Sequence, residues 1–267
     1  MNRTRFWAGV IACFASLISV PLSFAAAPAI ASAETGLAVG LTGSYVHYQE
    51  NLGPLSDSES GGLAGFSARL SRLGTVYGVS DVYAALNYQF SGGMIGYDGF
   101  TQPGQPYRTA DRAFFNQVEV RLGQGFTIAN GAEVIPFVSG GFQNWYRNIG
   151  GASGLGEYYQ AGEAGGGIKF DLVASPLLVL SASAEGTALF GGSVSAPALQ
   201  FKGNFGTSGE QRVSLGADYR VSGQWHLFAG LGVTHFNYSG SKADNGFFEP
   251  ESSTVVVRSE LGVAFGF

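Results

Sequence analysis

The chain has 267 residues, a formal net charge of −5, 42 glycines, 21 phenylalanines and only 12% charged residues. This charged share is about half that of an ordinary soluble domain, and the mild acidity excludes the basic surface that nucleic-acid binding requires. The single cysteine, Cys13, lies in the N-terminal segment, so the rest of the chain has neither disulfides nor thiolate chemistry.

The N-terminus has the pattern of a secretory signal peptide. Two arginines precede an apolar run, and a stretch of small residues follows it. Ala31 and Ala33 fit an Ala-x-Ala cleavage site, and a cut after Ala27 is the alternative. We therefore predict a signal peptide over residues 1–33, export through the Sec pathway, and a single mature domain over residues 34–267.

Beyond this segment no apolar run reaches the roughly 18 residues of a membrane helix. The pattern is instead a period-two alternation, as in Leu37, Val39 and Leu41, which share one face while small residues share the other. In chain order the alternation predicts ten strands, at 36–48, 64–72, 81–91, 115–123, 134–147, 158–172, 177–190, 211–221, 225–237 and 255–267. Eight or twelve strands are the alternatives, because the fifth and sixth are the least regular.

The connections between these strands alternate in length. Short turns are expected near 72–78, 124–132, 173–176 and 221–224. Long polar connections are expected near 50–61, 92–111, 148–156, 191–208 and 240–252. Transmembrane barrels have this arrangement, with short periplasmic turns and long external loops. The predicted fold class is all-β, a single antiparallel transmembrane β-barrel of ten strands with a polar lumen.

The charged residues of the predicted strands all share the face opposite the apolar one. Because a barrel in hydrocarbon presents apolar side chains to lipid, the charged face is the lumen. A soluble sandwich would show the reverse arrangement. The predicted lumen charge network contains seven basic and six acidic residues: Arg69, Glu119, Arg121, Arg147, Glu163, Lys169, Asp171, Glu185, Arg212, Asp218, Arg220, Arg258 and Glu260. Their near balance predicts a salt-bridged lumen, which is typical of a plugged or very narrow barrel.

With its signal peptide, its alternating strands and its terminal phenylalanine, the chain resembles Gram-negative outer-membrane β-barrel proteins, including opacity-type and small OmpA-like barrels. The resemblance covers essentially all of residues 36–267. The last strand carries Leu261, Val263, Phe265 and Phe267, which resemble the C-terminal signal read by the barrel assembly machinery. The resemblance implies an outer-membrane location, contact with membrane lipid and lipopolysaccharide, and that machinery as a partner during biogenesis.

The histidines do not form a recognisable catalytic pattern. Omptin-type proteases, which are ten-stranded barrels, place paired acidic residues and a His–Asp pair at the outer rim. Here His226 is predicted at the periplasmic end, and His47 and His235 on the lipid-facing side, so each is interpreted as an interfacial side chain. Ser44 and His47 are three residues apart on one strand and therefore on opposite faces, which argues against a Ser–His nucleophile.

We therefore predict no catalytic, cofactor-binding or metal-binding residues, and the inward glutamates are interpreted as structural partners of the basic residues. The favoured function is a structural or surface-interaction role through the external loops, whose ligand the sequence does not specify. Loops that mix aromatic and polar residues, such as 100–111, favour this hypothesis. The alternative is a narrow, porin-like channel for small solutes or ions, and a membrane-embedded hydrolase is a third hypothesis.

Overall fold

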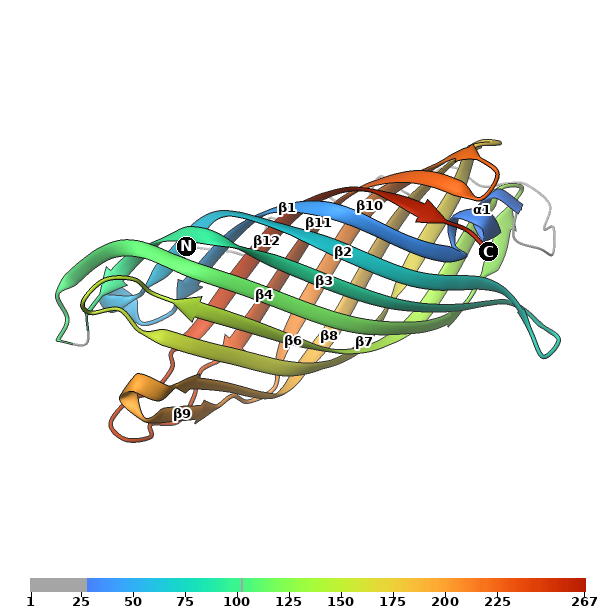
Figure 1. The fold of residues 1–267 in the computed structure, drawn as a ribbon. Helices are drawn as coiled ribbons and strands as arrows, with labels where there is room; N and C mark the ends of the chain where they lie inside the picture. Colours follow the sequence, from blue (N-terminus) through green and yellow to red (C-terminus); the bar gives the residue numbers. More distant parts are fainter. Residues whose placement is uncertain (1–27, 102) are drawn as a thin grey trace, which may run out of the picture.

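The computed structural model describes residues 28–101 and 103–267, so most of the predicted signal peptide lies outside the described residues. The described chain forms an elongated antiparallel β-barrel (Figure 1). Its ring consists of ten strands: β1 (Gly36–Glu50), β2 (Ser58–Val76), β3 (Val79–Phe100), β4 (Pro106–Gln124), β6 (Ala132–Asn148), β7 (Gly156–Ser175), β8 (Leu178–Ala196), β10 (Ser208–Ser222), β11 (Trp225–Ser239) and β12 (Glu251–Phe265). Each overlaps one of the predicted strands almost completely, which confirms the all-β fold class and the count of ten.

Five short elements accompany the ring. They are the helix α1 (Pro28–Ala33), the 3-10 turns η2 (Gly53–Leu55) and η3 (Pro197–Leu199), and the strands β5 (Phe126–Ala129) and β9 (Phe201–Asn204). β5 pairs with β6 and β9 pairs with β8, so both extend the wall without adding a strand to the ring. Among the described residues, no helix is both long and apolar enough to cross a membrane.

Closure of the ring follows from two pairings between strands that are not neighbours in the chain. The first strand pairs with the last along its length, from Leu37↔Phe265 to Glu50↔Ser252. β8 pairs with β10, past the excursion through β9. A closed ring gives every wall strand two hydrogen-bonded neighbours, which is the condition for a sheet in hydrocarbon.

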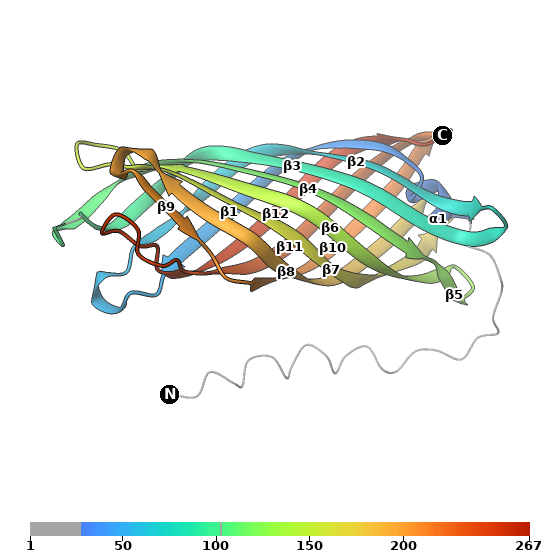
Figure 2. The same cartoon turned by 90° about the horizontal axis from the view of Figure 1, so that it is seen from below.

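The two ends of the barrel differ in their connections (Figures 1 and 2). One end, called the turn end here, carries α1, the C-terminus and the short connections. Tyr77 and Gly78 form one of them, with φ of 48° and 84°, as a two-residue hairpin turn with positive φ at both positions requires. The opposite, loop end carries β9 and the long connections.

The strands run further toward the loop end than predicted. Residues 92–100 and 106–111 continue β3 and β4 as a paired hairpin, from Gly92↔Phe114 to Phe100↔Pro106, so the predicted loop 92–111 is mostly strand. Glycines at 92, 93, 96 and 99 interrupt the apolar alternation there and hide the strand from a hydropathy pattern. Strands of 15 to 22 residues exceed the roughly 9–11 that cross a bilayer, so the wall extends beyond the hydrocarbon.

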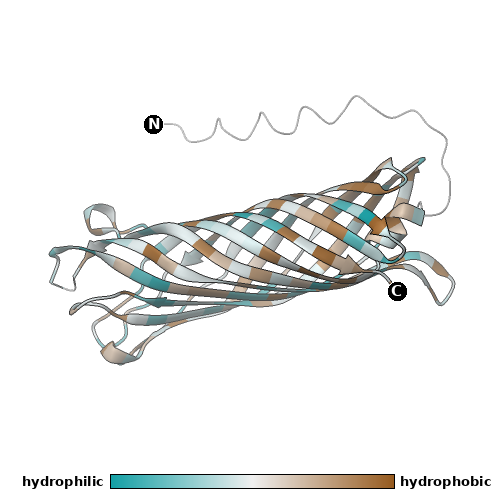
Figure 3. Cartoon of the chain, turned by 45° about the horizontal axis from the view of Figure 1, so that its top comes forward, coloured by the Kyte–Doolittle hydropathy of each residue, from teal (hydrophilic) through white to brown (hydrophobic). Residues whose placement is uncertain are grey.

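The outer surface of the barrel carries the apolar side chains. Leu41 and Leu261, neighbours on β1 and β12, are 76% and 66% exposed. Figure 3 shows hydrophobic positions alternating with neutral and hydrophilic ones along the strands. Aromatic side chains lie outward toward both ends, with Tyr45 and Tyr158 at the loop-end side and Trp225 packed edge-on against Phe265 at the turn end, 5.0 Å between ring centroids.

Candidate functional site

A belt of ion pairs crosses the middle of the lumen. Arg212 on β10 pairs with Glu119 on β4 and, at 2.5 Å, with Glu163 on β7. Arg121 on β4 pairs with Glu185 on β8 at 2.6 Å. Because β4 and β10 are four strands apart in a ring of ten, these side chains span the interior rather than follow the wall. We call these five residues the charge belt.

A second cluster closes the lumen near the loop end. Arg147 on β6 is 1% exposed and donates from Nε and Nη2 to the carboxylate of Glu59, at 2.9 and 2.6 Å. Its Nη1 donates to the Tyr159 hydroxyl at 2.7 Å and lies 3.1 Å from the Glu157 carboxylate. The guanidinium also lies over the Tyr48 ring, 4.4 Å from its centroid. We call these five residues the cap.

A carboxylate from the last long loop completes the cap. Glu249 accepts hydrogen bonds from the hydroxyls of Tyr159 at 2.7 Å and Tyr48 at 3.2 Å. Burial, and then the nearby carboxylates of Glu157 and Glu50, raise the pKa of Glu249 well above its ordinary range. Buried aromatic side chains pack around the cap: Trp145, Phe201, Phe205, Phe236 and Tyr238.

The turn end is closed by α1. Ile30 is fully buried among side chains of the barrel wall near the turn end, including Leu73 and Ile135. Directly after the helix, Glu34 pairs with Lys169 at 2.9 Å, and Lys169 also pairs with Asp171. These contacts belong to residues beside the predicted cleavage sites. A cut after Ala33 would remove α1 and keep the Glu34 pair, whereas a cut after Ala27 would keep both.

The structure corrects the interpretation of His226 as an interfacial side chain. The imidazole is 3% exposed, with Nδ1 2.5 Å from Asp218 Oδ1 and Nε2 3.2 Å from Ser32 Oγ of α1. Alternation explains the placement, because the flanking Trp225 and Leu227 are exposed on the outer face. His226 therefore helps to hold α1 within the lumen.

The other two histidines lie on the outer face. His235 contacts Gln211 at 3.1 Å and Ser253 at 3.0 Å. His47 has an exposed side chain and lies opposite Val255 in the β1–β12 ladder. Within residues 28–101 and 103–267, no three His, Cys, Asp or Glu side chains are grouped as metal ligands would be.

The structure places the predicted lumen residues as follows. Eight lie in ion pairs: Glu119, Arg121, Arg147, Glu163, Lys169, Asp171, Glu185 and Arg212. Asp218 contacts the His226 imidazole. Glu260 accepts a 2.6 Å hydrogen bond from Ser67, and Arg220 donates to a backbone carbonyl at the turn-end rim. Arg69 and Arg258 line the lumen, and no described residue forms an ion pair or hydrogen bond with either guanidinium.

Sequence patterns missed much of the acidic lumen. The buried carboxylates beyond the predicted set are Glu34, Glu50, Glu59, Asp111, Glu133, Glu210 and Glu249. Most of them fall in segments taken as loops or turns, beyond the ends of the predicted strands. Extending the alternation would have found Glu210, which lies two residues before Arg212 on the same face. The lumen therefore holds more carboxylates than cations, rather than the near balance expected.

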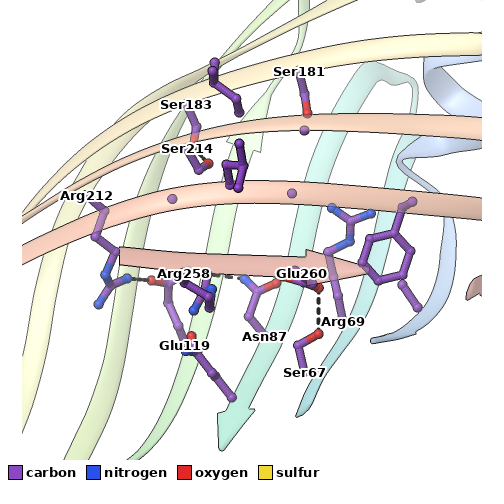
Figure 4. Close-up of a pocket in the computed structure, with 18 of the residues that line it drawn as sticks. Ser67, Arg69, Asn87, Glu119, Ser181, Ser183, Arg212, Ser214, Arg258 and Glu260 are labelled. Atoms are coloured by element: carbon purple, nitrogen blue, oxygen red, sulfur yellow. Dashed lines mark hydrogen bonds and ion pairs between the residues drawn. The ribbon is translucent and has the colours of Figure 1, made fainter. Parts of the chain in front are cut away.

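Two adjoining cavities remain among these charges. The central cavity, of about 200 Å³, lies among Arg69, Asn87, Glu119, Arg258 and Glu260 (Figure 4). The upper cavity, of about 70 Å³, lies on the cap side, and Trp145 of the aromatic cluster is part of its wall. Arg121, Arg212 and Arg258 line both cavities.

No protein-family model matches the chain, and no curated protein matches its sequence. The fold is similar to the crystal structure of the outer membrane protease OmpT from Escherichia coli, with a TM-score of 0.56 and 8% identity over 87% of this chain and 95% of that one. Neisserial surface protein A matches with a TM-score of 0.35 and 13% identity, over 87% of this chain and 98% of that one. Ail of Yersinia pestis matches with a TM-score of 0.32 and 12% identity, over 88% and 99%. The chain therefore has the fold of Gram-negative outer-membrane β-barrels.

Proposed function

With the outer-membrane barrel fold as the premise, we propose that this is an outer-membrane protein with a closed lumen that acts through its loop-end surface, in a structural or surface-interaction role. Short turns face the periplasm in this fold, so the loop end faces outward. The apolar outer surface contacts membrane lipid and lipopolysaccharide. Export follows the Sec pathway, and the barrel assembly machinery reads Leu261, Val263, Phe265 and Phe267.

The observation that carries the proposal is the crossing of the lumen at two levels. The charge belt joins β4 to β8 and β10 through hydrogen-bonded ion pairs, and the cap joins β6 to β2 around a buried arginine. Neither the belt nor the cap involves α1, so the lumen stays closed whether the signal peptide is cut after Ala27 or after Ala33. Breaking a buried pair by removing one partner is strongly unfavourable, so neither level opens by simple side-chain rotation.

With the lumen closed, the parts that can meet an external partner are the loops and the strand ends that project outward. The β3–β4 hairpin is the longest of these, and its exposed Arg108–Asp98 pair lies 2.8 Å apart on the outward extension. The arrangement supports recognition by the surface rather than passage through the interior. It also supports a role without catalysis, because the histidines at the loop-end side, His47 and His235, lie on the outer face.

A measurement of ion conductance distinguishes this proposal from the alternative, a narrow channel. Purified protein is refolded, checked for heat-modifiable migration on a gel, and inserted into a planar bilayer. A folded but silent sample supports the closed barrel. A variant in which both Glu59 and Arg147 are replaced by glycine is the matched control, because it removes the cap and tests whether the belt alone seals the lumen.

A further inference from the structure

The upper cavity has two chemically different walls. Apolar side chains from six strands form its upper part: Val46, Leu63, Phe115, Trp145, Phe236 and Val256. Its floor carries the guanidinium groups of Arg121, Arg212 and Arg258, and the central cavity continues beneath them. A site with an apolar wall and a few convergent polar groups is the usual form of a small-molecule pocket.

The three floor arginines are not equivalent. Arg121 and Arg212 are held by carboxylates of the belt. Arg258 has no hydrogen-bond or ion-pair partner in residues 28–101 and 103–267, and Figure 4 shows it in the cavity wall between the Arg212–Glu119 pair and Glu260. A guanidinium offers five donors in a planar fork and is costly to leave unpaired away from bulk water. Arg258 is thus the one floor cation whose donors are free for a ligand.

The chemistry of the two walls restricts the ligand class. A pure hydrocarbon would fill the apolar part but leave the Arg258 donors unsatisfied. An inorganic anion would satisfy Arg258 but leave the Val46, Leu63 and Phe115 surface in contact with water. A small carboxylic acid with an apolar body satisfies both walls, because a carboxylate accepts two parallel hydrogen bonds from one guanidinium.

We propose that the lumen holds a binding site for a small organic carboxylate, with the carboxylate on Arg258 and the apolar body beneath the cap. A cavity of about 150 Å³ is large enough for benzene. The upper cavity alone, of about 70 Å³, is smaller than this, but together with the adjoining central cavity of about 200 Å³ it has room for a ring and its carboxylate on either side of Arg258. The site goes beyond the proposed surface role, and does not require the lumen to conduct.

Benzoate is the probe, and Trp145 is the reporter, since it lines the cavity and is 3% exposed. The other described tryptophan, Trp225, is exposed on the outer surface, so a W225F background isolates the signal of Trp145 in the processed protein. Because the cavity is enclosed by cap and belt, the protein is refolded in the presence of ligand. Each sample of the series, refolded at its own ligand concentration, is checked for heat-modifiable migration, so that only folded protein is compared.

We expect benzoate to change the Trp145 emission saturably. Benzyl alcohol should bind at least tenfold more weakly, because its neutral hydroxyl cannot form the paired, charge-assisted hydrogen bonds that a carboxylate forms with Arg258. R258M, which keeps an unbranched side chain but removes the guanidinium, should weaken benzoate binding at least tenfold and change benzyl alcohol binding much less. R220M, at the turn-end rim, is the matched control and should bind benzoate like the parent. A113L, at a fully buried lining position, should weaken both ligands by filling the apolar part.

Three results would overturn the proposal. One is a folded parent that shows no saturable response to benzoate. The second is equal benzoate affinity in the parent and R258M, which would place the carboxylate elsewhere. The third is displacement of benzoate by inorganic phosphate at similar concentration, which would show a simple anion site that makes no use of the apolar wall.

Discussion

Replacing Arg147 by methionine should be the most damaging single charge deletion in the barrel. The substitution removes two hydrogen bonds to Glu59, of 2.9 and 2.6 Å, and leaves that carboxylate 1% exposed without its cation. Removing one partner of a buried ion pair costs about 3–5 kcal/mol, because the remaining charge stays desolvated. The lost stacking on Tyr48, at 4.4 Å, adds about 1 kcal/mol.

The assay is urea unfolding of the refolded protein in lipid vesicles, followed by tryptophan fluorescence and heat-modifiable migration. R147M should lose about 3–5 kcal/mol of unfolding free energy, and E59Q in the same chain should recover part of it by removing the stranded charge. R108M is the control, because its pair with Asp98 is exposed and solvent screening leaves such pairs little net stabilisation. Two results would refute the cap as described. One is a loss of unfolding free energy in R147M that is no larger than the loss in R108M. The other is an R147M/E59Q double variant that is no more stable than R147M.

Two further predictions concern pH and assembly. Burial raises the pKa of Glu249 in the folded protein. The stability that the protonated side chain contributes is therefore full below the ordinary pKa of 4.5, and it is lost as the pH rises through the folded-state pKa. The urea midpoint of unfolding should fall with rising pH, and it should fall less steeply in E249Q. A pH slope that is unchanged in E249Q would contradict this. Deleting Phe267 should reduce the folded fraction in the outer membrane, whereas alanine at Thr101 and Gln105 should not; normal folded amounts of the deletion variant would contradict the assembly role.

The period-two alternation of apolar residues predicts the strands correctly wherever the strands keep that period. A period of two assigns each residue to one face, so Leu41 and Leu261 were placed outward and Glu119 and Arg212 inward without knowledge of any contact. The count of ten followed from the same pattern, together with the alternating lengths of the connections. Those features depend on neighbours in the chain, which a sequence displays directly.

The cap could not be predicted in this way. Its members come from two pairs of strands, β1 and β2 in one and β6 and β7 in the other, and Arg147 meets Glu59 across 88 positions. Glu59 lay in a segment taken as a loop, because glycines follow it and interrupt the alternation. Tyr48 and Tyr159 lie on the inward face, where an aromatic residue is less expected than at a lipid interface. Only the three-dimensional closure of the ring brings these side chains together.

The free guanidinium of Arg258 illustrates the same limit. Its inward direction follows from alternation. The near balance of seven basic and six acidic residues predicts a salt-bridged lumen, but it does not say which cation is left without a partner. The belt carboxylates Glu119, Glu163 and Glu185 pair with Arg121 and Arg212. Whether a lumen charge is paired therefore depends on geometry across the barrel, which no count of signs can provide.

Single-channel recording of the refolded wild-type protein tests the central claim, a lumen closed by the charge belt and the cap. A sample that is folded by heat-modifiable migration and inserted in the bilayer should give no conductance steps, and removal of Arg147 and Arg212 together should produce them. Stable conductance steps from the folded wild-type protein would contradict the closed lumen and make the interior, rather than the loop-end surface, the functional part of the molecule.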